Sequence, residues 1–347
     1  MKKSLWISMW LGLALVVGCT KAEQKPAAEK PAAAETAEAK VAEKAPEPPR
    51  PSCVGAVKEG TATTVTTESG TWELNGSTLK WTGAGEKAAL SVGLLSDIKE
   101  GAAENLANID KFVAMFKERK VDLVLVAGDV GMNEGDITTV LTKLADVKVP
   151  VVSIMGNREG IAFYNSGIKA ANAAAAHVLN GNDIRRIDTD FVDFITLPGY
   201  HDVNYLHSDD GCAYTGADVA AVKELATKSD SPVVLMAHGG PLQTGEHAID
   251  LSAQGKHAGD PQLNNLIKDA GVKFGFFGNI HEAGGKATNL EGTEVVKAGE
   301  FHPSFFLNPG PADAMEWAMN DGSVSKGMGA LVEFSKDGTG KFEVVKF

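Results

Sequence analysis

The chain has 347 residues and a formal net charge of −12, from 45 acidic and 33 basic residues. Once the eight basic and six acidic residues of the first 50 are set aside, the rest of the chain carries a net charge of −14. A surface of that sign repels nucleic acid backbones and anionic lipid headgroups, so no nucleic acid partner is expected. The length beyond residue 50 suits one large α/β domain.

Residues 1–18 have the layout of a secretory signal peptide, with two early lysines followed by a mostly apolar run of 13 residues. A transmembrane anchor is the alternative, but a membrane-spanning helix needs about 20 residues. The letters LVVGC, which end at Cys19, resemble a bacterial lipobox with Val16 in the place of the usual leucine. The resemblance implies lipidation of Cys19. With Thr20 next, it implies a bacterial envelope protein anchored in the outer membrane and facing the periplasm.

Residues 19–51 contain the lipidated cysteine and then mainly alanine, glutamate, lysine and proline, with no apolar side chain larger than Val41. Such a composition cannot form a hydrophobic core, and the prolines interrupt any helix. We therefore expect a semi-extended tether over this range.

Two further cysteines, Cys53 and Cys212, follow the tether. Export would place both in an oxidising compartment, where a disulfide between them is plausible. Two buried free thiols are equally compatible with the sequence, so the pairing stays open at this point.

Residues 52–89 are predicted to form an extension built on a β-hairpin. Asn75-Gly76 suits a two-residue turn in which both residues take positive φ. The register places four large apolar side chains on one face and three polar ones on the other; these are Trp72, Leu74, Leu79 and Trp81, against Glu73, Thr78 and Lys80. Because an isolated hairpin is marginally stable, we expect the tryptophan face to pack on the main domain, with carbohydrate binding as the alternative.

Residues 90–347 alternate apolar runs with helical patterns. The runs ALSVGLLSD, VDLVLVAGD and VPVVSIMGN are each separated by a stretch with helical spacing, and similar runs continue to FFLNPGP. Such alternation predicts βαβ units in a single α/β domain.

Five polar residues lie at or just beyond the ends of separate apolar runs. They are Asp97, Asp129, Asn157, His238 and His281. The carboxyl ends of strands form the ligand crevice of open α/β sheets, so these side chains are expected to converge. A single aspartate after a strand is more often a helix cap or a turn residue, but five in succession favour a site.

The stretches around these residues are LLSDIKEG, LVAGDVG, IMGNREG, LMAHGGP and FFGNIHEAGG. In this order they resemble the motifs of the calcineurin-like metallophosphoesterases, over roughly residues 90–311. The resemblance implies a four-layer α/β/β/α sandwich with two divalent ions that hold the phosphate and supply the attacking oxygen. It implies Asp97 and His281 as ligands of the first metal, Asp129 as the bridge, and Asn157 and His238 as ligands of the second. Such donors suit Mn, Fe or Zn.

Three positions depart from the family pattern. Lys99 stands where the first metal expects an imidazole, Asn279 where the second does, and Arg158 where a histidine assists the leaving group. An ammonium repels a divalent ion, whereas Asn279 still offers a carbonyl oxygen as a weaker ligand. A guanidinium does not act as a proton donor. We therefore expect Lys99 to form an ion pair with Asp97 or Asp129 in place of the missing metal charge.

Other arrangements of the site remain open. Lys99 in solvent would leave a single-metal site of Asp129, Asn157 and His238, with Asn279 as an optional fourth ligand. A histidine from elsewhere would then be able to refill a coordination position; the candidates are His247, His257 and His302. His201 and His207 have ligand-like spacing, but nothing in the sequence ties them to the site.

Three functions follow from these observations. The favoured hypothesis is an envelope lipoprotein whose degenerate site binds a phosphorylated small molecule or another anion, with weak or lost hydrolysis and with Lys99 and Arg158 as fixed charges. The alternative is an active metal-dependent phosphoesterase acting on phosphomonoesters or phosphodiesters. The third is a structural envelope lipoprotein. The expected cofactor is a divalent metal of the Mn, Fe or Zn type, as a pair, as a single ion or not at all.

Overall fold

The computed structural model describes residues 52–83 and 87–347. The predicted signal peptide, the lipidation site Cys19 and the tether up to residue 51 lie outside the described residues. Within the described ranges, no helix has the length and apolar character needed to cross a membrane.

One sheet has six strands in the order β18-β17-β4-β5-β6-β7. Strands β4 to β7 run parallel to one another. The strands are β4 (Ala89–Leu95), β5 (Leu123–Val126), β6 (Val151–Ser153), β7 (Val178–Asn180), β17 (Met328–Ser335) and β18 (Gly340–Lys346). The crossover helices are α1 (Ala103–Glu118), α2 (Glu134–Leu144) and α3 (Ile161–Ala174). β5 reads LVLV and is buried along its whole length, as expected for a parallel strand covered on both faces.

The second sheet has ten strands in the order β1-β2-β3-β8-β9-β10-β11-β14-β12-β13. Its strands are β1 (Thr63–Thr67), β2 (Gly70–Asn75), β3 (Thr78–Trp81), β8 (Arg186–Asp188), β9 (Asp193–Leu197), β10 (Val233–Ala237), β11 (Phe274–Phe276), β12 (Lys286–Thr288), β13 (Val295–Val296) and β14 (Phe305–Asn308). Helices α4 (Gly216–Thr227) and α5 (Pro261–Ala270) cover it. A separate two-stranded ribbon, β15 (Trp317–Ala318) and β16 (Val324–Ser325), follows β14.

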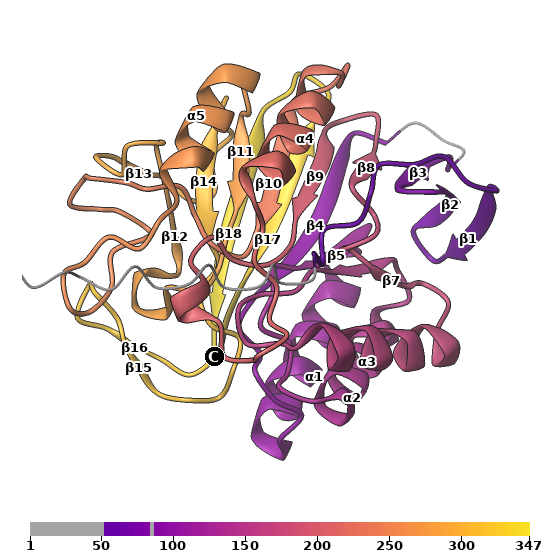
Figure 1. Ribbon diagram of the computed structural model, residues 1–347, viewed down its shortest axis with the longest axis horizontal. Helices are drawn as coiled ribbons and strands as arrows, with labels where there is room; N and C mark the ends of the chain where they lie inside the picture. Colours follow the sequence, from indigo (N-terminus) through magenta and orange to yellow (C-terminus); the bar gives the residue numbers. More distant parts are fainter. Residues whose placement is uncertain (1–51, 84–86) are drawn as a thin grey trace, which may run out of the picture. The chain divides into compact units, whose positions relative to one another are not determined.

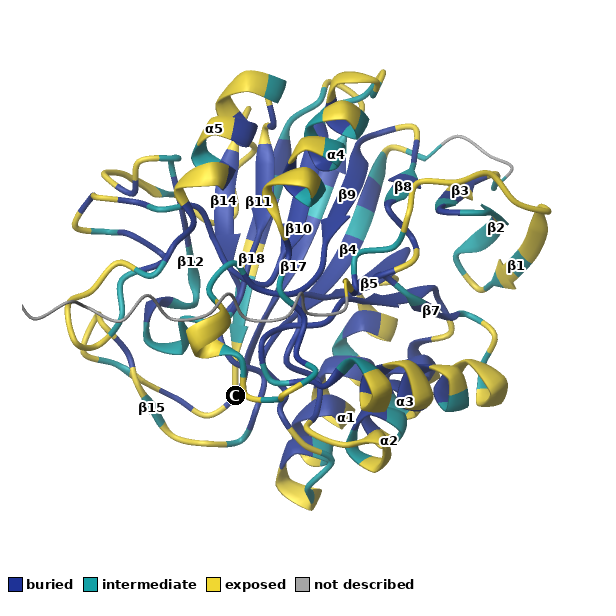
Figure 2. Ribbon diagram, viewed as in Figure 1, coloured by how far each residue is buried: buried dark blue, intermediate teal, exposed yellow. Residues whose placement is uncertain are grey.

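The two sheets pack face to face with helices on their outer faces, as Figure 1 shows for α1 to α3 on one side and α4 and α5 on the other. One apolar cluster contains side chains from both sheets and forms the centre of the sandwich. A second lies between the six-stranded sheet and α1 to α3, and a third between the ten-stranded sheet and α4 and α5. Figure 2 shows the central strands as buried. The predicted four-layer α/β/β/α sandwich is confirmed.

The predicted hairpin forms, but its turn differs from the prediction. Asn75 pairs with Thr78, so the two-residue loop is Gly76-Ser77, and only Gly76 of the two takes a positive φ. The loop moves because Ser77 forms two hydrogen bonds with the backbone of Lys58. The Ser77 N–H donates to the Lys58 carbonyl at 2.9 Å, and the Lys58 N–H donates to Ser77 Oγ at 3.0 Å. The register slips by two residues, which leaves every side chain on its predicted face.

The tryptophan face of the hairpin packs on the main domain. Trp72 and Trp81 are buried and belong to the apolar cluster between the sheets, which confirms that part of the prediction. The hairpin is also continuous with the large sheet, because β3 pairs with β8 in parallel and β1 adds a further strand on the outside. The three strands of the predicted extension, β1 to β3, are therefore part of the second sheet.

Cys53 and Cys212 form a disulfide. The sequence left this pairing open against two free thiols. The bond joins the first described residues to a loop before α4, in which the backbone N–H of Tyr200 donates to the carbonyl of Cys212 at 3.0 Å.

Candidate functional site

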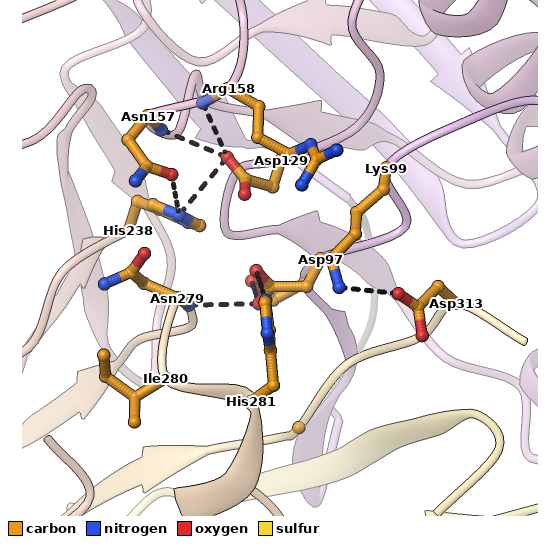
Figure 3. Close-up of polar contacts among 12 residues, drawn as sticks. Asp97, Lys99, Asp129, Asn157, Arg158, His238, Asn279, Ile280, His281 and Asp313 are labelled. Carbon is orange, nitrogen blue, oxygen red and sulfur yellow. Dashed lines mark hydrogen bonds and ion pairs between the residues drawn. The ribbon is translucent and has the colours of Figure 1, made fainter. Parts of the chain in front are cut away.

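The predicted site residues lie at strand ends where the backbone turns sharply. Among the described residues, six non-glycine residues have positive φ, and four of them belong to the site: Asp97, Lys99, Asp129 and Asn279. Such values are uncommon outside glycine and concentrate at functional sites. Gly156 has a related role, because a Cβ there would collide with Asp129 Oδ1. The turns direct polar side chains from both sheets into one region (Figure 3).

Asp97 and His281 meet on one side of this region. His281 Nε2 lies 3.0 Å from Asp97 Oδ1, while the backbone N–H of Asn279 and the hydroxyl of Ser96 donate to Asp97 Oδ2 at 3.1 Å and 2.7 Å. Burial alone would raise the pKa of Asp97. Its hydrogen bond to His281 and the charges of His281, His238 and Lys99 outweigh burial and hold that pKa well below its usual range.

Asp129, Asn157 and His238 meet on the other side. Asp129 Oδ1 accepts from the backbone N–H groups of Asn157 and Arg158 at 3.1 Å and 3.0 Å. His238 Nε2 lies 3.3 Å from Asp129 Oδ1 and 3.2 Å from Asn157 Oδ1. Asn157 donates its amide hydrogen to the carbonyl of Tyr205 at 2.9 Å, which leaves its oxygen facing His238.

The tautomer of His238 decides what this arrangement requires. Its Nδ1 lies 2.8 Å from the carbonyl oxygen of Ala127, an acceptor only, so Nδ1 carries a proton. In the neutral ring Nε2 then presents a lone pair to two oxygen acceptors, Asp129 Oδ1 and Asn157 Oδ1. Three acceptors that face one another need a cation between them, either a proton on Nε2 or a metal ion. A carbonyl behind a ligating imidazole is the usual support in metal sites.

The donor set also fits a metal ion by distance and chemistry. Asp97, Asp129 and His238 offer ligand atoms that all lie within 4.8 Å of one another, and all three residues are buried. Carboxylate and imidazole donors suit divalent ions such as Mn, Fe or Zn. The geometry therefore supports a metal centre at this edge of the two sheets.

A family model described as calcineurin-like phosphoesterase matches residues 90–283, more than half of the chain. The chain belongs to this family. No curated protein matches it. Similar solved structures include TT1561 of Thermus thermophilus, at 13% identity and TM-score 0.48, with 74% of this chain and 99% of that chain covered. A dimetal phosphatase from Danio rerio is similar at 12% identity and TM-score 0.45, with 75% and 100% covered.

Lys99 departs from the prediction for this phosphoesterase domain. Its Nζ lies 2.6 Å from Asp313 Oδ2 and pairs with neither Asp97 nor Asp129, so the predicted ion pair is wrong. The alternative, Lys99 in solvent, is also wrong because its side chain is only 6% exposed. The nearer partner comes from the segment after β14, which the prediction did not consider.

Among the described residues, the Arg158 side chain forms no ion pair with Asp97 or Asp129, whose ionic partners are His281 and His238. Arg158 Nη2 lies 3.4 Å from Met132 Sδ, a weak acceptor, and the described residues provide no hydrogen-bond partner for its buried Nε. Only its backbone N–H serves Asp129. The guanidinium therefore retains donors for a ligand beside the centre.

A cavity of about 500 Å³ adjoins the centre and is lined by Asn157 and Asn279 together with loop residues of the ten-stranded sheet. His201 and His207 also line it, so the structure ties both to the site, contrary to the sequence interpretation. Asn279 donates its amide hydrogen to the Tyr200 hydroxyl at 3.0 Å, which leaves its carbonyl oxygen available.

The three histidines proposed to refill a coordination position differ in place. His257 lines the same cavity, with Nδ1 2.9 Å from Asp250 Oδ1. His247 lies beside Glu246 near the surface, and His302 contacts the carbonyl of Lys297. Among the described residues, none of these three histidines has a hydrogen bond or ion pair with Asp97, Asp129 or His238.

Sequence reasoning missed the residues that hold Lys99, the residue that holds Asn279, and the role of Glu159. Asp313 and Trp317 hold Lys99, and Tyr200 holds Asn279; none of them lies in a family motif. Glu159 was part of a quoted motif but received no role. It accepts from the backbone N–H groups of Gly156 at 2.9 Å and Val130, and burial together with the charge of Asp129 raises its pKa to about 7.

These shifts predict how the metal-free protein responds to pH. The lowered pKa of Asp97 contributes stability that is present above its unfolded value of 3.8 and is lost as the pH falls. The raised pKa values of His238, above 6.5, and Glu159, about 7, contribute stability that is lost as the pH rises through them. Stability is therefore expected to be greatest at about pH 4–4.5, and to fall as the pH rises from about 4.5, the unfolded value of Glu159, past 7. Urea unfolding in EDTA across this range measures it, and stability that still rises from about pH 6.5 to 8 would contradict it.

Proposed function

We propose that this phosphoesterase domain binds a phosphorylated small molecule or a similar anion at a divalent cation, with weak or lost hydrolysis. The observation that carries the proposal is the convergence of Asp129 Oδ1 and Asn157 Oδ1 on His238 Nε2 at 3.2–3.3 Å, which needs positive charge and suits a divalent ion as well as a proton on Nε2. A divalent ion held there by Asp129, His238 and Asn157 would supply positive charge to phosphate oxygens.

Arg158 provides the second contact for the anion. Its backbone N–H contacts Asp129, its guanidinium keeps donors unused by the described residues, and an arginine fork suits two oxygens of a phosphate. The sequence analysis expected Lys99 to share this role, but Asp313 already neutralises its charge. The ligand is therefore held by one fixed cation and by the metal.

The same substitutions explain why hydrolysis is expected to be weak. A guanidinium keeps its proton in proteins, so Arg158 cannot protonate a leaving group as a histidine would. Asn279 offers an amide oxygen where an imidazole is usual, and Lys99 removes an imidazole altogether. Binding of the phosphate group depends on charge and survives these changes, whereas proton transfer does not.

The cellular setting belongs to the same proposal. Cys19 would anchor the protein in the outer membrane, and residues 19–51 would hold the domain in the periplasm. The disulfide between Cys53 and Cys212 supports export, because disulfides persist in oxidising compartments. No nucleic acid is expected to bind to the acidic chain.

An active phosphoesterase remains the second candidate, and one observation favours it. His257 faces the cavity that Asn157 and Asn279 line, and Asp250 orients its ring through Nδ1 at 2.9 Å. Histidine is the most frequent general acid in enzymes, and the carboxylate of Asp250 fixes the orientation of this one. Under this candidate His257 replaces the proton donor that is lost at position 158.

Binding of inorganic phosphate tests the proposal. With Mn²⁺ present, Arg158→Ala is expected to weaken phosphate binding about tenfold or more, because a charge-assisted hydrogen bond to an ion contributes roughly 1.5–3 kcal/mol. Arg158→Lys, which keeps the charge but not the fork, is expected to lose less. Titration calorimetry measures both, with Arg119→Ala as the control, since Arg119 forms an exposed pair with Glu343.

The outcomes separate the three functions. Turnover of an aryl phosphate by the wild type in the ordinary range of about 1 per second or more, lost in His257→Asn, would establish the active enzyme. Absence of phosphate binding with and without Mn²⁺ would leave the structural lipoprotein. Phosphate binding that depends on Arg158, with turnover far below that range, supports the proposal.

A further inference from the structure

Lys99 and Asp313 form an ion pair that is buried at the edge of the candidate metal centre. Lys99 Nζ and Asp313 Oδ2 are 2.6 Å apart, and the two side chains are 6% and 1% exposed. Leaving one partner of such a pair buried and alone is strongly unfavourable. The pair is therefore a fixed part of the site and not a mobile surface contact.

Further contacts fix each member of the pair. Trp317 Nε1 donates to Asp313 Oδ1 at 2.8 Å, and the Asp313 backbone N–H donates to the carbonyl of Asp97 at 3.2 Å. Lys99 Nζ lies 4.0 Å from the centre of the Trp317 ring, within cation–π range. Both oxygens of Asp313 are thus occupied, and the ammonium is held between a carboxylate and an aromatic face.

The charge balance of the centre depends on this arrangement. With Lys99 neutralised by Asp313, the two carboxylates of Asp97 and Asp129 retain two negative charges, which match one divalent cation. The pair nevertheless lies beside both carboxylate residues, because the Lys99 backbone N–H donates to the carbonyl of Asp129 at 2.8 Å and the Asp313 backbone N–H donates to that of Asp97. An ammonium freed from Asp313 would therefore have Asp97 as its next carboxylate partner, and would compete there with a metal ion.

We propose that Asp313 and Trp317 form a clamp that holds Lys99 away from Asp97 and Asp129 and so keeps the centre open to one divalent ion. This inference rests on the metal site of the proposed function, but not on the phosphate ligand. Asp313 and Trp317 act as positioning residues, since neither offers a ligand atom to the cluster of Asp97, Asp129 and His238.

The clamp also explains why one ion is expected where the family pattern has two. The cluster whose donor atoms lie within 4.8 Å of one another contains Asp97, Asp129 and His238, but not His281. The His281 ring packs on Trp317, with ring centres 4.1 Å apart, while its Nε2 lies 3.0 Å from Asp97 Oδ1. In the family pattern, a second ion on this side of the centre would be bound by an imidazole at position 99. In this chain, position 99 is a lysine whose ammonium is paired with Asp313.

A charge-swap series with Mn²⁺ as the probe tests the clamp. Wild type is expected to bind one Mn²⁺ per chain by calorimetry, with the EPR spectrum of an isolated ion. Asp313→Asn frees the ammonium and is expected to weaken Mn²⁺ binding about tenfold or more, since a like charge within a few Å is poorly screened when buried. Lys99→Met combined with Asp313→Asn removes both charges and is expected to restore the affinity to within about threefold of wild type.

Two further variants complete the design. Trp317→Phe keeps an aromatic face but removes the hydrogen bond to Asp313, and is expected to weaken Mn²⁺ binding less than Asp313→Asn does. Glu316→Gln, which removes an exposed pair with Lys326 in the same segment, is the matched control and is expected to bind Mn²⁺ as the wild type does. Thermal unfolding confirms that each variant is folded before its affinity is compared.

Each result bears on one proposal or the other. Two Mn²⁺ ions or none in the wild type, an unchanged affinity in Asp313→Asn, or a double variant no tighter than Asp313→Asn would overturn the clamp. One Mn²⁺ bound with rescue in the double variant, but without phosphate binding, would refute the proposed function and leave the clamp standing.

Discussion

Reduction of the disulfide between Cys53 and Cys212 is expected to lower the free energy of unfolding by about 3–5 kcal/mol, the loss typical of a native bond that closes a long loop. The two cysteines are 159 positions apart, so the bond restricts a large part of the unfolded chain. Both cysteines are also part of the apolar cluster under α1 to α3. Two free thiols would lose the restriction while keeping most of the packing.

Urea unfolding with and without a phosphine reductant measures this loss. Replacing both cysteines by serine is the matched variant: it is expected to be about as unstable as the reduced wild type and indifferent to the reductant. A reduced wild type as stable as the oxidised form would contradict the prediction.

The same bond is expected to affect the ligand cavity. The carbonyl of Cys212 accepts from the N–H of Tyr200, and the Tyr200 hydroxyl receives the amide of Asn279, so the bond supports a wall of the cavity. Reduced protein that remains folded is therefore expected to bind phosphate more weakly than oxidised protein.

Local sequence patterns predicted the alternating strands and helices and most of the cluster, whereas the four-layer arrangement followed from the family resemblance. Buried parallel strands such as β5 read as unbroken apolar runs, and the residues after them must reach the same edge of a sheet. Asp97, Asp129 and His238 were found in this way, each from the end of its own strand. Their roles as ligands remain part of the proposal.

The partners of the substituted residues were not predictable by the same reasoning. Asp313 lies 214 positions after Lys99, in an irregular segment without periodicity, so no local pattern pairs the two. The hairpin turn failed for a similar reason: Asn75-Gly76 has the stronger local preference, but hydrogen bonds between Ser77 and Lys58 moved the loop by one residue. In both cases a contact between distant segments outweighed a local preference.

Restoring the family's histidines is expected to produce the largest gain in activity, but the structure changes which variant is needed. Lys99→His alone would leave Asp313 buried without its cation, which costs about 3–5 kcal/mol. Asp313→Asn must therefore accompany it. Asn279→His suits the local backbone, because φ is 65° there and histidine tolerates such values better than most residues. Arg158→His supplies a proton donor beside Asp129.

The four changes together are expected to raise Mn²⁺-dependent hydrolysis of an aryl phosphate by about 100-fold or more over the wild type, the usual contribution of a positioned general acid. The version that retains Arg158 is the control for metal binding without the acid, and it is expected to bind more Mn²⁺ with little gain in turnover. The fourth change should then add a bell-shaped pH profile that the control lacks. If wild-type turnover is already high and falls in the variant, Lys99 and Arg158 take part in a working mechanism. Replacing them by the family's own residues would lower the rate only if they serve the reaction.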